Sequence, residues 1–330
     1  MLFQVLFTSL ALLTEGPAVC RVGAATVAQI RNERITGSLE AAETEARQLL
    51  ECPELEDVDR IALQIELAKI LDRVGLHHNT RPVVESLEIL RRAQAAIDAA
   101  DSTSKARVEL ALAEYFYRAE MSERKFTVAT ENARRAEALF RDLDDPVGET
   151  DAVHRLGLIE LQKSNLQEAR KLFDRSLVLS RKGPHRLIFL SDYHRHVGFI
   201  DRASGDLERA ILRFEKSLDY RNQAGSRDYG LFARTMLGTA LIEGGRPEEA
   251  REYLEQALQI ARDIRSPVGE LRATYALGKM YETLGDFQEA VRRFRRAEEQ
   301  AAELGVASIQ KAAQDGVTRL SMTSEESNPR

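Results

Sequence analysis

The clearest pattern of apolar and polar positions lies in residues 273–297, where small and large apolar residues recur among charged ones. The positions that carry it are Leu277, Gly278, Tyr281, Gly285, Asp286, Ala290, Phe294 and Ala297. Apolar residues three or four apart share one face of a helix, so the pattern predicts two helices joined by a turn at Gly285-Asp286. Gly278 and Ala290 are small enough to let these helices cross closely. A single hairpin of this kind cannot bury its apolar face, so further hairpins must stack on it.

The same positions return along the second half of the chain with a constant period. A glycine recurs after steps of 41, 40 and 40 residues, at Gly157, Gly198, Gly238 and Gly278. An alanine recurs with the same steps, at Ala169, Ala210, Ala250 and Ala290. A large apolar residue follows in phase, at Phe173, Phe214, Leu254 and Phe294. Because these series agree on one period, they predict four regular hairpins, at about 145–182, 184–225, 226–265 and 267–303.

Two similar segments mark where helices begin. Asp145 and Ser266 each precede a proline in the sequence Pro-Val-Gly-Glu, and they lie 121 residues apart, which is the sum of the three steps. A polar N-cap followed by proline at the first helical position is typical of a helix start. We therefore expect helices to begin at 146 and 267.

The N-terminal half carries weaker copies of the pattern. The segment Thr26–Leu50 predicts a first hairpin, and two more follow with turns that are longer by six and four residues, the first of which contains His77-His78. The amphipathic segment Val306–Leu320 predicts a capping helix. The expected fold is all-α, a solenoid of about seven antiparallel helix hairpins over residues 25–320 plus that cap. The polar tail 321–330 is expected to be disordered.

Residues 1–24 have a different character. Residues 2–13 form a short apolar core, which is followed by Gly16-Pro17 and then by small residues. This arrangement resembles a secretory signal peptide that is cleaved near Ala24, although it lacks a positively charged leader. It predicts a periplasmic or secreted protein; the alternative is an extra N-terminal helix on a cytoplasmic protein.

Composition and charge narrow the function classes. The 330 residues have a formal net charge of -6, which argues against nucleic acid as a partner. No interior run approaches the ~18 apolar residues of a membrane span. Two cysteines give neither a disulfide framework nor a zinc spacing.

The sequence contains none of the common motifs of catalytic or cofactor sites. No nucleophile elbow, phosphate-binding loop or zincin motif is present, and Gly244-Gly245 occupies a hairpin-turn position. His194 and His196 are two residues apart, so they point to different faces of a helix and do not form a metal site. The sequence thus predicts no enzyme, no cofactor and no metal.

The paired marks Leu277-Gly278 and Ala290-x3-Phe294 resemble the tetratricopeptide repeat (TPR) signature over residues 26–303. The period near 40 is similar to that of the long repeats in spindle-orientation adaptors, kinesin light chains and bacterial regulatory TPR proteins. This resemblance implies a right-handed superhelix in which the first helix of each hairpin lines a concave groove. Long-repeat peptide adaptors have asparagine directly after the Leu-Gly pair, where this chain has Leu158, Phe199, Thr239 and Lys279.

The same resemblance implies which residues face the groove. These partner-binding candidates are His154, Leu158, Arg195, Phe199, Arg202, Phe232, Thr235, Ile242, Arg272, Tyr275 and Lys279. Arg195, Phe199 and Arg202 are spaced to form one stripe of cation, aromatic ring and cation. Such a stripe could hold an acidic or aromatic side chain. The alternative is that Phe199 packs on the next helix while both arginines pair with local acids.

The expected function is that of a non-enzymatic scaffold that binds a partner peptide or domain in the groove. The alternative is a sensory or regulatory TPR module that binds a small molecule or a short signal peptide. An open polar channel would favour the first, and a closed apolar pocket would favour a small ligand.

Overall fold

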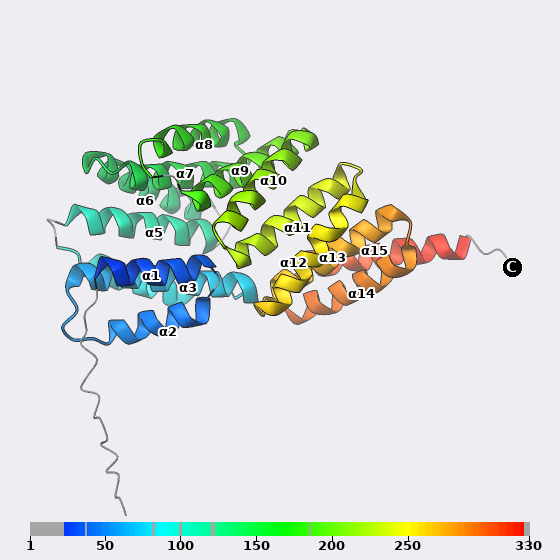
Figure 1. The fold of residues 1–330 in the computed structure, drawn as a ribbon, viewed down its shortest axis with the longest axis horizontal. Helices are drawn as coiled ribbons and strands as arrows, with labels where there is room; N and C mark the ends of the chain where they lie inside the picture. Colours follow the sequence, from blue (N-terminus) through cyan, green and yellow to red (C-terminus); the bar gives the residue numbers. More distant parts are fainter. Residues whose placement is uncertain are drawn as a thin grey trace, which may run out of the picture.

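The computed structural model describes residues 23–36, 38–80, 83–98, 101–119, 123–184 and 186–326. These residues form fifteen α-helices and no strand (Figure 1). In chain order the helices are α1 (Ala24–Thr36), α2 (Leu39–Leu50), α3 (Asp57–His78), α4 (Val84–Ala95), α5 (Ser102–Ala119), α6 (Glu123–Asp142), α7 (Pro146–Gln162), α8 (Leu166–Ser180), α9 (Leu187–Ala203), α10 (Leu207–Gln223), α11 (Arg227–Glu243), α12 (Pro247–Asp263), α13 (Pro267–Leu284), α14 (Phe287–Glu303) and α15 (Ala307–Glu326).

The helices pair as consecutive antiparallel hairpins, and each hairpin packs on the next. The seven pairs run from α1 and α2 to α13 and α14, and α15 covers the last pair. The prediction of an all-α solenoid with seven hairpins and a cap is confirmed. The cap is longer than expected, because α15 continues to Glu326, so residues 321–326 are helical and not a disordered tail. The segment 1–24 lies outside the described residues except for Gly23 and Ala24, where α1 begins.

The periodic glycines and large apolar residues contact one another inside each regular hairpin. A Cβ atom added at Gly238 would lie 2.6 Å from Leu254 Cδ2, and one added at Gly198 would lie 2.8 Å from Phe214 Cε1. Gly157 contacts Phe173 and Gly278 contacts Phe294 in the same way, as the constant period of these residues in the sequence predicts. The glycine therefore lets the large residue of the partner helix pack directly on the backbone.

Caps and turns fix the ends of these helices. The Asp145 carboxylate accepts hydrogen bonds from the backbone N–H groups of Val147 and Gly148 at 3.0 Å, and Ser266 Oγ accepts one from Gly269 N at 3.1 Å. The predicted helix starts at 146 and 267 are thus confirmed. Gly245 and Gly285 have φ values of 74° and 80°, which only glycine adopts easily, and each ends the first helix of its hairpin.

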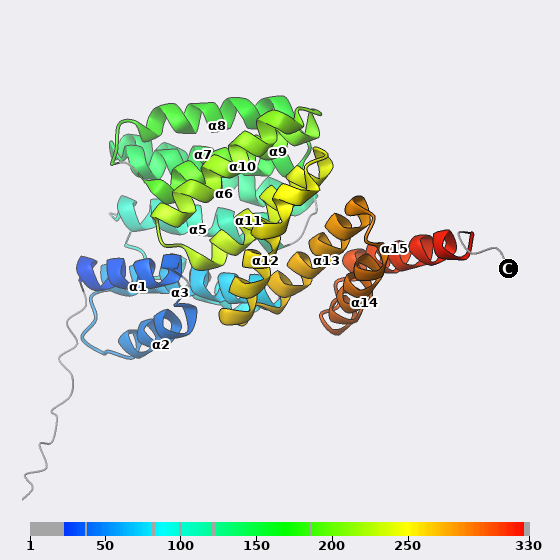
Figure 2. The ribbon, with the colours of Figure 1, turned by 45° about the vertical axis from the view of Figure 1, so that its right-hand side comes forward.

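The array curves so far that its early and late hairpins meet. Helix α3, from the second hairpin, contacts α13 from the seventh, and the views in Figures 1 and 2 both show these helices together. A solenoid repeat normally contacts only its neighbours. The longer turn expected around His77-His78 is wrong, because both residues belong to the last turn of α3. The extra residues lengthen this helix, and they bring its end to the late hairpins.

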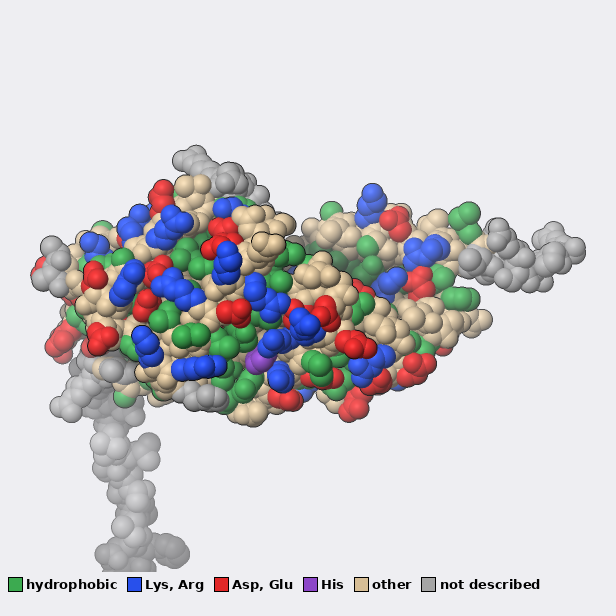
Figure 3. Space-filling view, turned by 90° about the horizontal axis from the view of Figure 1, so that it is seen from above, with side chains coloured by type: hydrophobic (Ala, Val, Ile, Leu, Met, Phe, Trp, Pro, Cys, Tyr) green, Lys and Arg blue, Asp and Glu red, His purple; other side chains and the backbone are tan. Residues whose placement is uncertain are grey.

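The outer surface carries both charges. On the face seen from above in Figure 3, lysine and arginine side chains are interspersed with aspartate and glutamate. Many of them pair at helical spacing, as Arg293 does with Glu289 at 2.7 Å. Within the part of the chain that is described, no helix is long and apolar enough to cross a membrane.

Candidate binding site in the concave face

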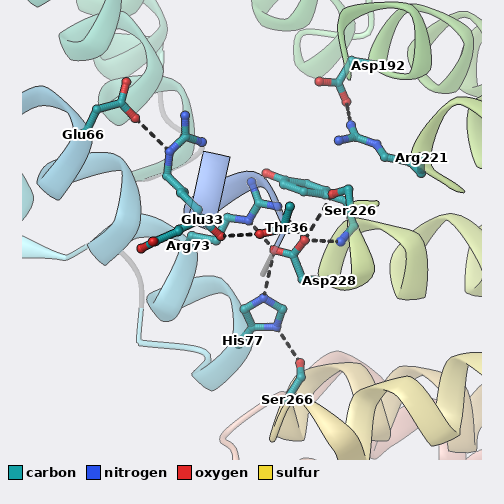
Figure 4. A network of polar contacts seen from close by, with 12 residues as sticks. Glu33, Thr36, Glu66, Arg73, His77, Asp192, Arg221, Ser226, Asp228 and Ser266 are labelled. Atoms are coloured by element: carbon teal, nitrogen blue, oxygen red, sulfur yellow. Dashed lines mark hydrogen bonds and ion pairs between the residues drawn. The ribbon is translucent and has the colours of Figure 1, made fainter. Parts of the chain in front are cut away.

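A buried ion pair closes the curved array. Arg73 near the end of α3 forms a two-pronged contact with Asp228 at the start of α11: its Nη2 donates to Asp228 Oδ1 at 2.7 Å, and its Nε donates to Oδ2 (Figure 4). The two side chains are 6% and 2% exposed. The Arg73 guanidinium holds the pKa of the Asp228 carboxyl well below its usual range, although burial alone would raise it. A desolvated pair of opposite charges with two hydrogen bonds fixes the orientation of the two helices.

His77, one turn further along α3, adds contacts to both late hairpins. Its Nδ1 lies 2.7 Å from Ser266 Oγ, at the N-cap of α13, and its Nε2 lies 3.7 Å from Asp228 Oδ2. Its ring also stacks on Phe232, with the ring centres 5.6 Å apart. Asn79, which ends α3 in a left-handed conformation, donates from Nδ2 to the backbone oxygen of Leu304 at 3.0 Å. The end of α3 therefore contacts four residues of the late hairpins, Asp228, Phe232, Ser266 and Leu304.

Tyr229 lies between two arginines that come from different hairpins. The guanidinium carbon of Arg73 is 3.6 Å from the centre of the ring, and that of Arg221 is 4.6 Å from it. Such contacts between a cation and an aromatic face are stronger when they are shielded from water. Burial would raise the pKa of Tyr229, but the positive charges of Arg73 and Arg118 outweigh it and lower that pKa. Arginines from two hairpins thus meet at this ring, and each of them is also paired with a carboxylate.

A cavity of about 190 Å³ lies beside this contact. Its walls come from five helices, α3, α9, α10, α11 and α13. The lining residues are Leu76, Arg195, Phe199, Ser217, Arg221, Tyr229, Phe232, Ala233, Thr235, Met236 and Arg272. Apolar surface dominates the lining, and three arginines supply the charge. This combination of apolar walls with a few charged groups is usual for binding sites in proteins.

Five of the residues expected in the groove line this cavity. They are Arg195, Phe199, Phe232, Thr235 and Arg272. Thr235 is 9% exposed and donates from Oγ1 to the backbone oxygen of Leu231 at 3.0 Å, so its hydroxyl proton is already used. Phe199 is half-buried and packs edge-on against Phe214 at 5.4 Å, with part of its ring on the cavity.

Three other expected groove residues are buried and do not offer an accessible surface. His154, Leu158 and Ile242 are 7%, 5% and 9% exposed. His154 and Leu158 lie on α7, which contacts α9 on this side, and Ile242 lies on α11, which contacts α13. These three residues do not line the cavity, and their contact with a partner stays a prediction.

The remaining three expected residues lie outside the cavity. Arg202 forms a two-pronged exposed ion pair with Glu243 of the next hairpin, with Nε to Oε2 at 2.7 Å. Tyr275 packs against Phe294, with the ring centres 5.7 Å apart. Lys279 pairs with Glu282 at 2.8 Å. Both arginines of the expected stripe pair with local acids, Arg195 with Asp192 at 3.1 Å and Arg202 with Glu243. Of the three residues in the stripe, only Arg195 and Phe199 line the cavity.

His154 instead forms a buried histidine pair. Its Nε2 lies 2.9 Å from Nδ1 of His196, and both rings pack against Phe173. Burial lowers the pKa of His154 to about 3, opposed by Asp192, and it lowers the pKa of His196 well below 6.5. Both rings are neutral at pH 7, so one donates and the other accepts. In the described part of the chain no cluster of three metal-ligating side chains occurs.

Sequence reasoning missed Arg73, His77, Arg221 and Tyr229. Arg73 and Asp228 are 155 positions apart, so nothing local in the sequence relates them. Arg221 belongs to a second helix of a hairpin, and the groove prediction considered only first helices. The sequence did hold one signal, because Arg73 and His77 lie close together near the end of a long apolar helix. Such side chains need polar partners when they are buried.

Comparisons with known proteins agree with this architecture. Two family models described as tetratricopeptide repeat match residues 231–303 and 191–263. Tetratricopeptide repeat protein 29 of Trypanosoma brucei brucei is 26% identical over 202 residues, which are 56% of this chain and 36% of that protein. The chain thus spans about a third of the length of this curated relative.

Solved structures show the same fold at low identity. A signal-transduction ATPase with a tetratricopeptide repeat sensor, from Pyrococcus horikoshii, has a TM-score of 0.64 at 17% identity, over 90% of this chain and 43% of that one. A Rap conjugation gene regulator in complex with a Phr peptide has a TM-score of 0.55 at 12% identity, over 92% and 94% of the two chains. A Rap protein complexed with competence and sporulation factor has a TM-score of 0.54 at 10% identity, over 92% and 99%. Residues 191–303 therefore match the tetratricopeptide repeat models, and the same glycine contact recurs before them, between Gly157 and Phe173.

Proposed function

We propose that this protein is a non-enzymatic interaction module that binds a peptide segment of a protein partner in its concave cavity. The observation that carries the proposal is the cavity itself, whose walls come from five helices and combine apolar surface with arginines. Interface energy concentrates in aromatic and arginine residues at the centre of a patch. Phe199, Phe232 and Arg272 are residues of that kind, and they are half-buried or exposed in the unbound chain.

The size of the cavity supports a side chain as its occupant. A volume of about 190 Å³ is below the range of roughly 300–1,000 Å³ that is usual for drug-sized ligands. It is close to the space of one large side chain with its neighbouring backbone. A peptide could therefore place one anchor in the cavity while the rest of its length lies on the surface outside.

Similar solved structures support a peptide as well. The Rap conjugation gene regulator is bound to a Phr peptide, and its chain matches this one over almost its whole length. At 12% identity this likeness concerns the fold, and the residues of the cavity carry the proposal for this chain.

A regulatory module is the second candidate, and one observation favours it. Leu76 of α3 forms part of the cavity wall, and α3 is held in place by its contacts with Asp228 and Ser266. A ligand that touches Leu76 would therefore bind the closed array better than an open one. Such a difference in affinity is what allows a ligand to shift a conformational equilibrium.

Photo-crosslinking tests the binding site directly. A photoreactive phenylalanine derivative replaces Met236 in the cavity, and in a control it replaces Leu212, which is 58% exposed on α10 and does not line the cavity. The full chain is irradiated in an extract of its native host, and the captured peptides are sequenced. We expect a protein that crosslinks to position 236 and not to position 212. Capture from position 212 alone would place the partner surface elsewhere and contradict the proposal.

A further inference from the structure

We infer that the cavity selects a peptide anchor in which an acidic side chain stands beside an apolar or aromatic one. This inference rests on the proposed function, because it names the class of peptide that the cavity takes. It follows from the positive charges that line the cavity and from the unpaired N–H groups of Arg195 and Arg272. It also follows from the apolar wall between these two arginines.

The cavity carries a local excess of positive charge in a chain whose overall charge is negative. Arg195, Arg221 and Arg272 line it, and none of its lining residues is acidic. Asp192, which does not line the cavity, accepts from both Arg195 and Arg221 through the same oxygen, Oδ1. One negative charge thus serves two arginines, and the third has no carboxylate within ion-pair distance in the described chain. The overall charge of -6 shows that this excess is local.

Arg272 is the arginine best placed for a ligand. Its guanidinium lies 5.7 Å from the centre of the Phe232 ring, and no ion pair or hydrogen bond holds it in the described structure. Loss of surrounding water lowers its pKa, although its side chain still reaches solvent from the concave surface. A partly desolvated cation without a counter-ion is stabilised when a carboxylate binds to it.

Arg195 offers a second free donor. Its Nη2 donates to Asp192 at 3.1 Å, whereas its buried Nε has no hydrogen-bond partner. A buried N–H group without a partner is costly, so a ligand oxygen within its reach would be favoured. Arg195 lies on α9 and Arg272 on α13, and α11 separates the two helices. The two arginines therefore flank the cavity from two sides.

Between these donors the wall is apolar. Phe199, Phe232, Met236 and Leu76 supply rings and aliphatic carbon atoms. An inorganic anion such as phosphate would leave this surface uncovered, whereas a peptide anchor with neighbouring acidic and apolar groups covers both kinds of wall. The geometry thus favours a peptide over a free anion.

A displayed library of random peptides provides the probe. The full chain is panned, and enriched peptides are kept when they block crosslinking from position 236. We expect the retained peptides to share a glutamate or aspartate next to a leucine, phenylalanine or tyrosine. Inorganic phosphate at millimolar concentration serves as the free-anion arm and is expected not to compete.

Removing the charge from the peptide carboxylate or from Arg272 tests whether the two groups contact each other. For a retained peptide, both its own Glu→Gln change and Arg272→Met in the protein should weaken binding by about tenfold or more, and the two changes together should cost little more than one. Arg202→Met is the matched control, because Arg202 is also an arginine of the expected groove but is already paired with Glu243. This control should leave affinity unchanged.

The outcomes separate the two proposals. Retained peptides without an acidic residue, or affinities that ignore the Glu→Gln change, would overturn the acidic anchor and leave the cavity as a peptide site. Failure of every enriched peptide to block position 236 would overturn peptide binding in the cavity itself. The Glu→Gln change alters only the peptide, so misfolding of a variant does not affect that arm.

Discussion

Arg73 of α3 and Asp228 of α11 form a buried ion pair across 155 residues of sequence, and this pair joins the second hairpin of the array to the sixth. In most solenoids each repeat is stabilised only by its neighbours. Here the stability of the late hairpins depends in part on an early one, and the cavity gains a wall that its own hairpins do not provide.

We expect the pair to show strong coupling in a double-mutant cycle. Asp228→Asn should leave Arg73 buried without a counter-charge and lower the free energy of unfolding by about 3–5 kcal/mol. Replacement of both residues by apolar ones, as in Arg73→Met with Asp228→Leu, should cost less than either single change. Urea unfolding of the unchanged chain, Arg73→Met, Asp228→Leu and the double variant measures the cycle. Additive losses would contradict a direct buried pair.

The closing contact should also affect ligand affinity. Because Leu76 lines the cavity only while α3 is held, Asp228→Asn is expected to weaken a peptide that blocks position 236. Asp263→Asn is the control. Asp263 forms an exposed ion pair with Arg227, which precedes Asp228 at the start of α11. Isothermal titration with the peptide compares the two variants. Equal affinities would show that α3 does not contribute to the site.

The buried histidine pair predicts loss of stability in acid. The unfolded chain binds protons at these residues as the pH falls below 6.5, the ordinary pKa of histidine, whereas folded His154 stays neutral down to about pH 3. The unfolded state therefore binds more protons between these values. The free energy of unfolding should be constant above pH 6.5 and fall as the pH decreases through that window.

Variants isolate this contribution. His154→Leu together with His196→Leu should flatten the decline of the melting temperature between pH 6.5 and 4. His78→Leu, which changes an exposed histidine, should leave the decline as it is. An unchanged slope in the double variant would mean that other groups, such as the paired carboxylates, govern acid unfolding.

Close packing at the repeat glycines gives a further prediction. Gly238→Leu should lower the free energy of unfolding by about 1–3 kcal/mol, because a Cβ atom there already meets Leu254 at 2.6 Å. Val178→Leu, at a position 59% exposed, provides the control and should change stability by no more than about 0.5 kcal/mol. Thermal melting of the two variants measures this difference in stability. Equal melting temperatures would refute the packing role of Gly238.

Much of the fold could be predicted because each hairpin repeats a local physical rule. The spacing of Gly238 and Leu254 encodes the contact that the two residues make, and the caps at Asp145 and Ser266 lie next to the helices they start. These contacts join residues within one repeat of about forty residues, so a single sequence is enough to predict them.

The candidate site was only partly predictable, because it depends on how far the array curves. Arg195 and Arg272 could be assigned to the inner side from their place in the repeat. Burial of His154 and the pairing of Arg202 with Glu243 depend on the distance between adjacent hairpins, which the repeat pattern does not give. The contact between Arg73 and Asp228 depends on the rotations between several successive hairpins taken together. No short stretch of sequence determines that total rotation.

The contact between Asn79 and the Leu304 backbone carries a consequence for the order of folding. These residues are 225 positions apart, and the intervening hairpins must take their curvature before the ends can meet. Local hairpins form early because closing a short loop costs less entropy than closing a long one. We therefore expect the long-range contacts of α3 to form after the transition state for folding. Contacts of that kind slow unfolding and have little effect on the rate of folding.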